Sequence, residues 1–167
     1  AASLAETHWS RNPDSAFANI EAGLAYGRLW EQTGNPEDLD RARNYFRTAL
    51  TQEPVFSVYF ADLAILDWQA GDEDGALWAV QRAAALAYQE PSIKLLEGWI
   101  LEQVGENNAA KKAYERTLQL EPDWVTHTFW EESELRKAVQ REYLQQVSVS
   151  PSSWEPVWQA YAKGDLD

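Results

Sequence analysis

The sequence predicts an all-α fold, a solenoid of stacked helix–turn–helix pairs, and two observations carry this prediction. Gly71 and Gly105 lie 34 residues apart, and similar residues follow each of them at matching distances. A repeat of this length is typical of arrays of helix pairs. Apolar residues in the same region recur at three- and four-residue spacing, which is the period of one helix face. The residues with this spacing are Tyr45, Phe46, Leu50, Leu77, Val80, Leu86, Tyr114 and Leu118.

The chain divides at its prolines. Residues 1–13 are interpreted as the trailing helix of a truncated repeat, and three units follow at about 14–54, 55–90 and 91–122. A proline disfavours helical backbone at the residue before it, so a helix usually ends at or before that residue. Within the first unit, Pro36 suits a first helical position, where a missing N–H costs nothing. The prolines that close the units are Pro54, Pro91 and Pro122.

Turn residues separate the two helices of each later unit. Gly71 is followed by Asp72, and Gly105 is followed two residues later by Asn107. Asp and Asn side chains accept hydrogen bonds from the first N–H groups of a helix. We therefore expect Asp72 and Asn107 to cap the second helices of their units.

Beyond Pro122 the repeat register is lost. Residues 123–167 are interpreted as C-terminal capping helices, because a solenoid needs a cap over its last apolar face; a linker towards another domain is the alternative. A short helix is expected within 124–130, and a second is expected to start near Ser133. A linker over 147–151 and a last helix from Ser152 complete the prediction.

The repeat pattern resembles the tetratricopeptide repeat (TPR) family over roughly residues 14–122. The resemblance implies a right-handed superhelical solenoid whose paired helices approach closely at small residues. These small residues are Gly27, Ala64 and Gly98 on the first helices and Ala42, Ala76 and Ala110 on the second. The closing proline of the second unit comes three residues late, and the first unit has three extra residues in its turn.

The resemblance also implies a binding surface, because the first helices of such repeats line a concave groove. Carried over by position, the partner-binding residues are Leu24, Arg28, Ala61, Asp62, Ile65, Trp68, Leu95, Trp99 and Glu102. The expected groove is apolar and aromatic in its middle with acids at its edges. It suits an amphipathic helix or an extended apolar segment of a partner.

The tryptophans have two interpretations. Trp68 and Trp99 are candidate anchors for a partner, because aromatic side chains dominate interface energetics. Burial in the chain's own core is the alternative, and it is the interpretation preferred for Trp30 and Trp78. A further possibility is that the predicted last helix, which carries Trp154 and Trp158, fills the groove itself.

Composition excludes several classes of partner and site. A net charge of −13, spread along 167 residues, argues against nucleic acid and anionic membranes, because such affinity comes from basic groups. No long apolar run predicts a membrane span. No cofactor and no metal site is expected, since cysteine is absent and His127 with Glu131 is interpreted as a surface pair. The groove positions also lack the Lys and Asn residues with which one TPR subclass binds chaperone carboxylates.

These observations favour a non-catalytic protein-interaction module over an enzyme. The alternative is that the chain is the soluble TPR tail of a larger bacterial membrane protein, because Trp-rich acidic tails of this kind resemble those of O-antigen polymerases and ligases. The absence of methionine suggests a piece of a longer protein. Either a cytoplasmic or an exocytoplasmic location fits, and the sequence leaves the oligomeric state open.

Overall fold

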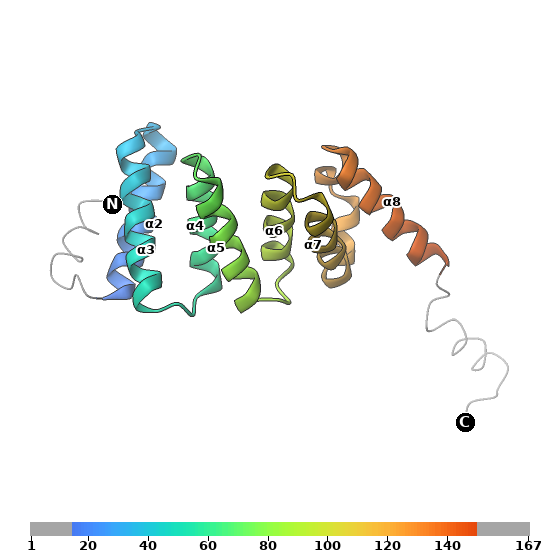
Figure 1. The fold of residues 1–167 in the computed structure, drawn as a ribbon, viewed down its shortest axis with the longest axis horizontal. Coiled ribbons are helices and arrows are strands. Elements are labelled where there is room, and N and C mark those ends of the chain that lie inside the picture. Colours follow the sequence, from blue (N-terminus) through green and yellow to red (C-terminus); the bar gives the residue numbers. More distant parts are fainter. Residues whose placement is uncertain (1–14, 150–167) are drawn as a thin grey trace, which may run out of the picture.

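A computed structural model describes residues 15–149 of the chain, and the described part is helical without a strand (Figure 1). The predicted trailing helix within 1–13 and the last helix from Ser152 lie outside the described residues. The helices are α2 (Ala16–Thr33), α3 (Pro36–Gln52), α4 (Ser57–Gln69), α5 (Glu73–Leu86), α6 (Pro91–Gln103), α7 (Asn107–Leu120), the 3-10 helices η1 (Pro122–Thr126) and η2 (Thr128–Glu131), and α8 (Glu134–Val149).

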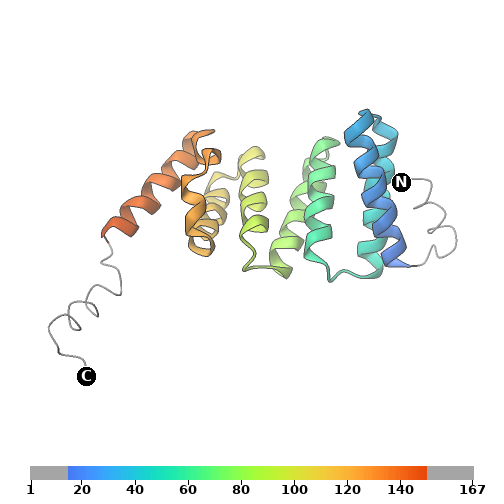
Figure 2. The same ribbon diagram turned by 180° about the vertical axis from the view of Figure 1, so that it is seen from behind.

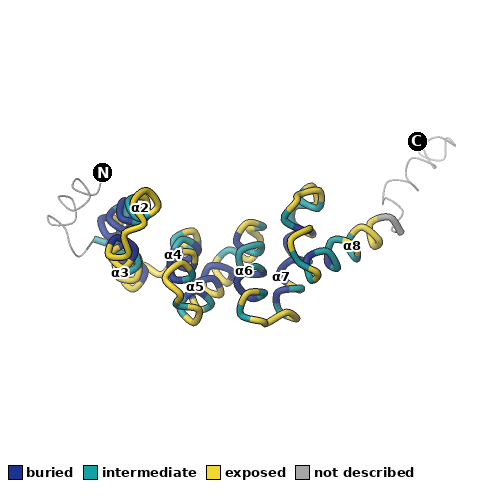
Figure 3. The backbone as a smooth tube through the Cα atoms, turned by 90° about the horizontal axis from the view of Figure 1, so that it is seen from above, coloured by how far each residue is buried: buried dark blue, intermediate teal, exposed yellow. Residues whose placement is uncertain are grey.

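The helices form three antiparallel pairs. α2 packs on α3, α4 on α5 and α6 on α7, so each predicted unit contains one pair, and successive pairs contact each other through α3 with α4 and α5 with α6. Viewed from above, the stack is an arc with α2, α4 and α6 on its inner side (Figure 3). Figure 2 shows this inner face from the front. The predicted all-α solenoid of helix pairs is confirmed.

The turns at Gly71 and Gly105 have the same backbone geometry. Both glycines have positive φ, 76° and 85°. In each turn the glycine N–H donates to the carbonyl three residues earlier, and the next N–H donates to the carbonyl five residues before it, at 2.8 to 3.1 Å. This pair of hydrogen bonds is the Schellman motif, which satisfies carbonyl groups at the end of a helix. The 34-residue repeat seen in the sequence is therefore also a structural repeat.

The helix starts follow the predictions at two of three positions. Pro36 is the first residue of α3, and the Oδ1 atom of Asp72 accepts a hydrogen bond from Gly75 N at 2.9 Å. Asn107 is not a cap, because it is already the first residue of α7, and the preceding Glu106 makes no side-chain capping hydrogen bond. The prediction at this turn is wrong by one residue.

Small residues bring the paired helices together, although the first pair differs from expectation. A Cβ atom on Gly98 would lie 2.5 Å from the ring of Tyr114, as expected for close packing. In the first pair the tight contact is at Gly23, whose added Cβ would lie 2.9 Å from Phe46. At Gly27 the nearest atom would be 3.9 Å away. A methyl group at Gly27 would therefore fit on the inner face without a clash.

The C-terminal part differs from the predicted helices in detail. The expected short helix is two 3-10 helices, η1 and η2. α8 starts as predicted, since Ser133 Oγ accepts from Arg136 N at 3.1 Å, but it continues to Val149, so no linker begins at Val147. η2, α8 and α7 pack together, which covers the end of the last repeat.

Trp78 is not a core residue. It is 52% exposed, and its ring meets the Phe60 ring edge to face, at 5.6 Å between centroids. Ala79 and Val80 are fully buried in its place. The period of α5 therefore points these two neighbours inward and leaves Trp78 on the outside.

Candidate interaction groove

Four of the predicted partner-binding residues line one pocket between α2 and α4. The pocket has a volume of about 150 Å³. Leu24, Arg28, Asp62 and Ile65 contribute to its wall, together with Gly23, Gly27, Glu31, Phe46 and Leu66. We call this set of residues the groove pocket. It lies between two inner helices of the arc, where the sequence predicted a partner-binding surface.

Asp62 is the most unusual side chain of the groove pocket. It is half-buried, and it makes no hydrogen bond or ion pair with any residue in 15–149. Burial raises the pKa of its carboxyl above the ordinary value of 3.8, because the charged form loses water without gaining a partner. The sequence placed acids at the edges of the groove, but this one lies inside it.

The other two charged residues of the groove pocket are more accessible. Arg28 and Glu31 are exposed on α2, and neither forms an ion pair within the described part of the chain. Ile65 is also accessible, with 44% of its surface exposed. An apolar side chain and two residues of opposite charge thus lie around a half-buried carboxylate.

Trp68 and Trp99 connect α4 to α6. Their rings meet edge to face, with 5.2 Å between centroids and 75° between planes. Both indoles are partly buried and pack against the main core. Their contact stabilises the stacking of two units, and part of each ring remains accessible. Their role as anchors for a partner stays a prediction.

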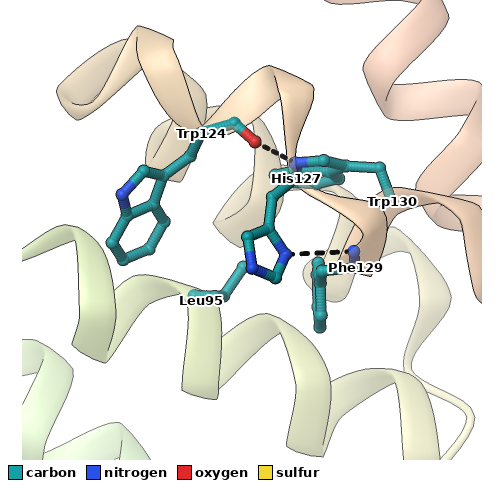
Figure 4. A pocket seen from close by; sticks show the side chains of 5 residues that line it. All are labelled: Leu95, Trp124, His127, Phe129 and Trp130. Atoms are coloured by element: carbon teal, nitrogen blue, oxygen red, sulfur yellow. Dashed lines mark hydrogen bonds between the residues drawn. The ribbon is translucent and has the colours of Figure 1, made fainter.

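Leu95 lies in a second apolar pocket, which the sequence did not predict (Figure 4). Its other lining residues are Trp124, His127, Phe129 and Trp130, and its volume is about 150 Å³. Trp130 Nε1 donates to the Trp124 carbonyl at 2.7 Å, and the backbone N–H of Phe129 donates to His127 Nδ1 at 3.1 Å. The concentration of aromatic residues after Pro122 was the available signal.

Glu102 holds the C-terminal helix in place. Its Oε2 atom accepts from Arg136 Nε and from the Tyr114 hydroxyl, each at 2.7 Å. The Glu102 side chain is 11% exposed and that of Arg136 4%. Although burial opposes it, hydrogen bonds from Ser133, Tyr114 and Arg136 lower the pKa of Glu102. Its carboxylate is therefore already engaged within the chain.

Ala61, the remaining predicted residue, is buried at 9% exposure in the main core. It offers a partner little surface. The groove pocket, rather than the full predicted set, is the part of the inner face that is both open and chemically distinctive.

The described residues contain no group of three or more His, Asp or Glu side chains that could hold a metal ion. His127 and Glu131 do not share an α-helical face, because His127 lies between the two 3-10 helices. Within residues 15–149, the helices are too short or too polar for a membrane span.

Comparison with known proteins identifies the fold. No protein-family model and no curated protein matches the sequence. Among solved structures, MamA superposes with a TM-score of 0.68 at 17% identity, covering 86% of this chain and 82% of MamA. YrrB, described as a TPR protein with an unusual peptide-binding site, gives 0.65 at 18% identity over 83% and 72% of the two chains.

The first TPR domain of RPAP3, solved with the HSP90 peptide SRMEEVD, gives a TM-score of 0.57 at 19% identity over 80% of this chain and 94% of that one. At identities this low, the three superpositions show that the fold is shared and nothing more. Together with the paired helices and the repeated glycine turns, they show that the described part of the chain has the tetratricopeptide-repeat fold.

Proposed function

We propose that the chain is a non-catalytic interaction module that binds a segment of another protein on its inner face, at the groove pocket. The observation that supports this most strongly is the convergence of Leu24, Arg28, Asp62 and Ile65 on one open pocket. Two structures with the same fold, those of YrrB and RPAP3, are described as binding peptides.

The chemistry of the groove pocket suits a peptide. Leu24 and Ile65 supply apolar surface, and burying such surface against a partner is worth about 25 cal/mol per Å². An α-helix or extended segment would place one apolar side chain against Ile65 while its neighbours extend along α4 and α6. A few side chains of the groove pocket would thus recognise the bound segment, as in other peptide-recognition grooves.

Selection of phage-displayed random peptides on the immobilised 167-residue chain tests the proposal. The affinities of selected peptides are then measured by fluorescence anisotropy. Ile65→Arg, which places a bulky charge in the groove pocket, should weaken them at least about tenfold. Leu86→Arg is the matched control, because Leu86 is 45% exposed, like Ile65, but lies at the end of α5 outside the groove pocket.

The expected result is a set of peptides that lose affinity for Ile65→Arg and keep it for Leu86→Arg. Circular dichroism of both variants controls for folding. Selected peptides that bind both variants as well as the original chain would show that the groove pocket is not the binding site.

A further inference from the structure

We propose that the groove pocket selects a partner segment carrying a cationic side chain, Lys or Arg, which pairs with Asp62 between flanking apolar residues. The inference rests on the proposed function, since it names the chemistry of the segment that would occupy the groove pocket. In addition, the Asp62 carboxylate would determine which partner segments bind.

The carboxylate of Asp62 has no hydrogen-bond or charge partner among residues 15–149. Two other carboxylates of the described part are paired: Asp67 accepts from Arg43 Nε at 2.6 Å, and Glu102 from Arg136 Nε at 2.7 Å. Asp62 has no such contact, although Arg28 lines the same pocket. A desolvated carboxylate without a partner destabilises the folded chain, and an incoming cation would remove this penalty.

The groove pocket has room for a side chain beside Asp62. Gly27 lies across the pocket from α4, and a Cβ atom on it would meet only Leu66, at 3.9 Å. The missing side chain at this position keeps the approach to Asp62 open. An aliphatic stem, as in Lys or Arg, can pack on Leu24 and Ile65 while its charged end reaches the carboxylate.

The charged residues that line the groove pocket are acidic overall. Glu31 and Asp62 are acidic and Arg28 is basic, so the charged residues of the groove pocket sum to −1. The whole chain carries −13, so a basic segment is also attracted from a distance. Arg28, at the exposed rim, favours an acidic or polar residue elsewhere in the same segment.

A double-mutant cycle on the whole chain tests this inference. From the phage selection described above, one takes peptides whose binding depends on Ile65 and replaces a Lys in them by Met, which has a similar apolar stem but no charge. Affinities are measured for the original chain, for Asp62→Asn and for Glu53→Gln. Glu53 is the matched control because it is exposed, outside the groove pocket and without an ion pair in the described part.

We expect enrichment of Lys or Arg among Ile65-dependent peptides. The Lys-to-Met change should weaken binding to the original chain and to Glu53→Gln by about tenfold, and binding to Asp62→Asn by less than about twofold. Ile65-dependent peptides without such enrichment, or an equal loss on all three chains, would overturn the cation inference and leave the proposed function standing. An absence of Ile65-dependent peptides would overturn the proposed function itself.

Discussion

Two carboxylates on neighbouring units of the solenoid have opposite surroundings, and their pKa values shift in opposite directions. Glu102, at the junction of α6, α7 and α8, accepts hydrogen bonds from Arg136 and Tyr114, and its pKa is lowered. Asp62, in the groove pocket between α2 and α4, has no partner in the described part, and burial raises its pKa. The junction is therefore arranged for stability, whereas the groove pocket holds a charge that a bound molecule could neutralise.

The largest effect is expected at the junction. Arg136→Ala leaves Glu102 buried without its counter-charge and should lower the free energy of unfolding by about 3 kcal/mol. Urea denaturation followed by tryptophan fluorescence measures it. Lys137→Ala is the control: its pair with Glu134 is exposed, so its loss should cost at most about 1 kcal/mol.

The same junction predicts a pH dependence with a defined sign. Because the folded-state pKa of Glu102 lies below 4.5, its stabilising effect is present above that value and is lost as the pH falls through the folded-state pKa. The difference between the original chain and Arg136→Ala should shrink over this range. A difference independent of pH would show that the ion pair is not its source.

Two glycine-to-alanine substitutions compare how tightly the helices pack near the junction and at the groove pocket. Gly98→Ala forces a methyl group against the Tyr114 ring at 2.5 Å and should cost about 1–3 kcal/mol. Gly27→Ala meets only Leu66, at an ordinary contact distance of 3.9 Å, and should gain up to about 1 kcal/mol from helix propensity while narrowing the groove pocket. Thermal unfolding distinguishes the two. Equal destabilisation would contradict the fit of a methyl group at Gly27.

Substitutions at Gly71 and Gly105 test whether the turns of the second and third units have equivalent surroundings. Gly71→Ala and Gly105→Ala each place a Cβ atom at positive φ and should each cost about 1 kcal/mol. Nearly equal losses in chemical denaturation would confirm that the units are equivalent repeats. A loss at only one of the two positions would mean that their surroundings differ.

The smallest expected effect is a gain at the groove pocket. Asp62→Asn removes an uncompensated charge and should raise the free energy of unfolding at pH 7 by less than about 1 kcal/mol. A raised folded-state pKa means that ionisation costs native stability, so the gain is full above that pKa and vanishes as the pH falls below 3.8. Measurement of both chains at several pH values checks the sign.

The sequence was sufficient to predict features that depend on local spacing. The solenoid and its turns follow from the 34-residue period, and the resemblance to the TPR pattern placed Leu24, Arg28, Asp62 and Ile65 on the inner helices, where they line one pocket. The pairing of Glu102 with Arg136 was not predictable, since it joins residues 34 positions apart through the docking of α8.

The errors have related causes. Trp78 was expected in the core because it is large and apolar, yet Ala79 and Val80 occupy the inward face of α5. The half-burial of Asp62 depends on how α2 packs beside α4, which a repeat pattern does not specify. The repeat register therefore predicted which residues share the inner face, but not how far each of them is buried.

Titration of the side-chain carboxyl groups of the whole chain by NMR tests the central contrast most directly. We expect Asp62 to titrate above 3.8 and Glu102 to titrate below 4.5 in the same sample. An Asp62 pKa at or below 3.8 would mean that the carboxylate is already compensated within the chain, and it would contradict the assignment of the groove pocket as a site awaiting a cation.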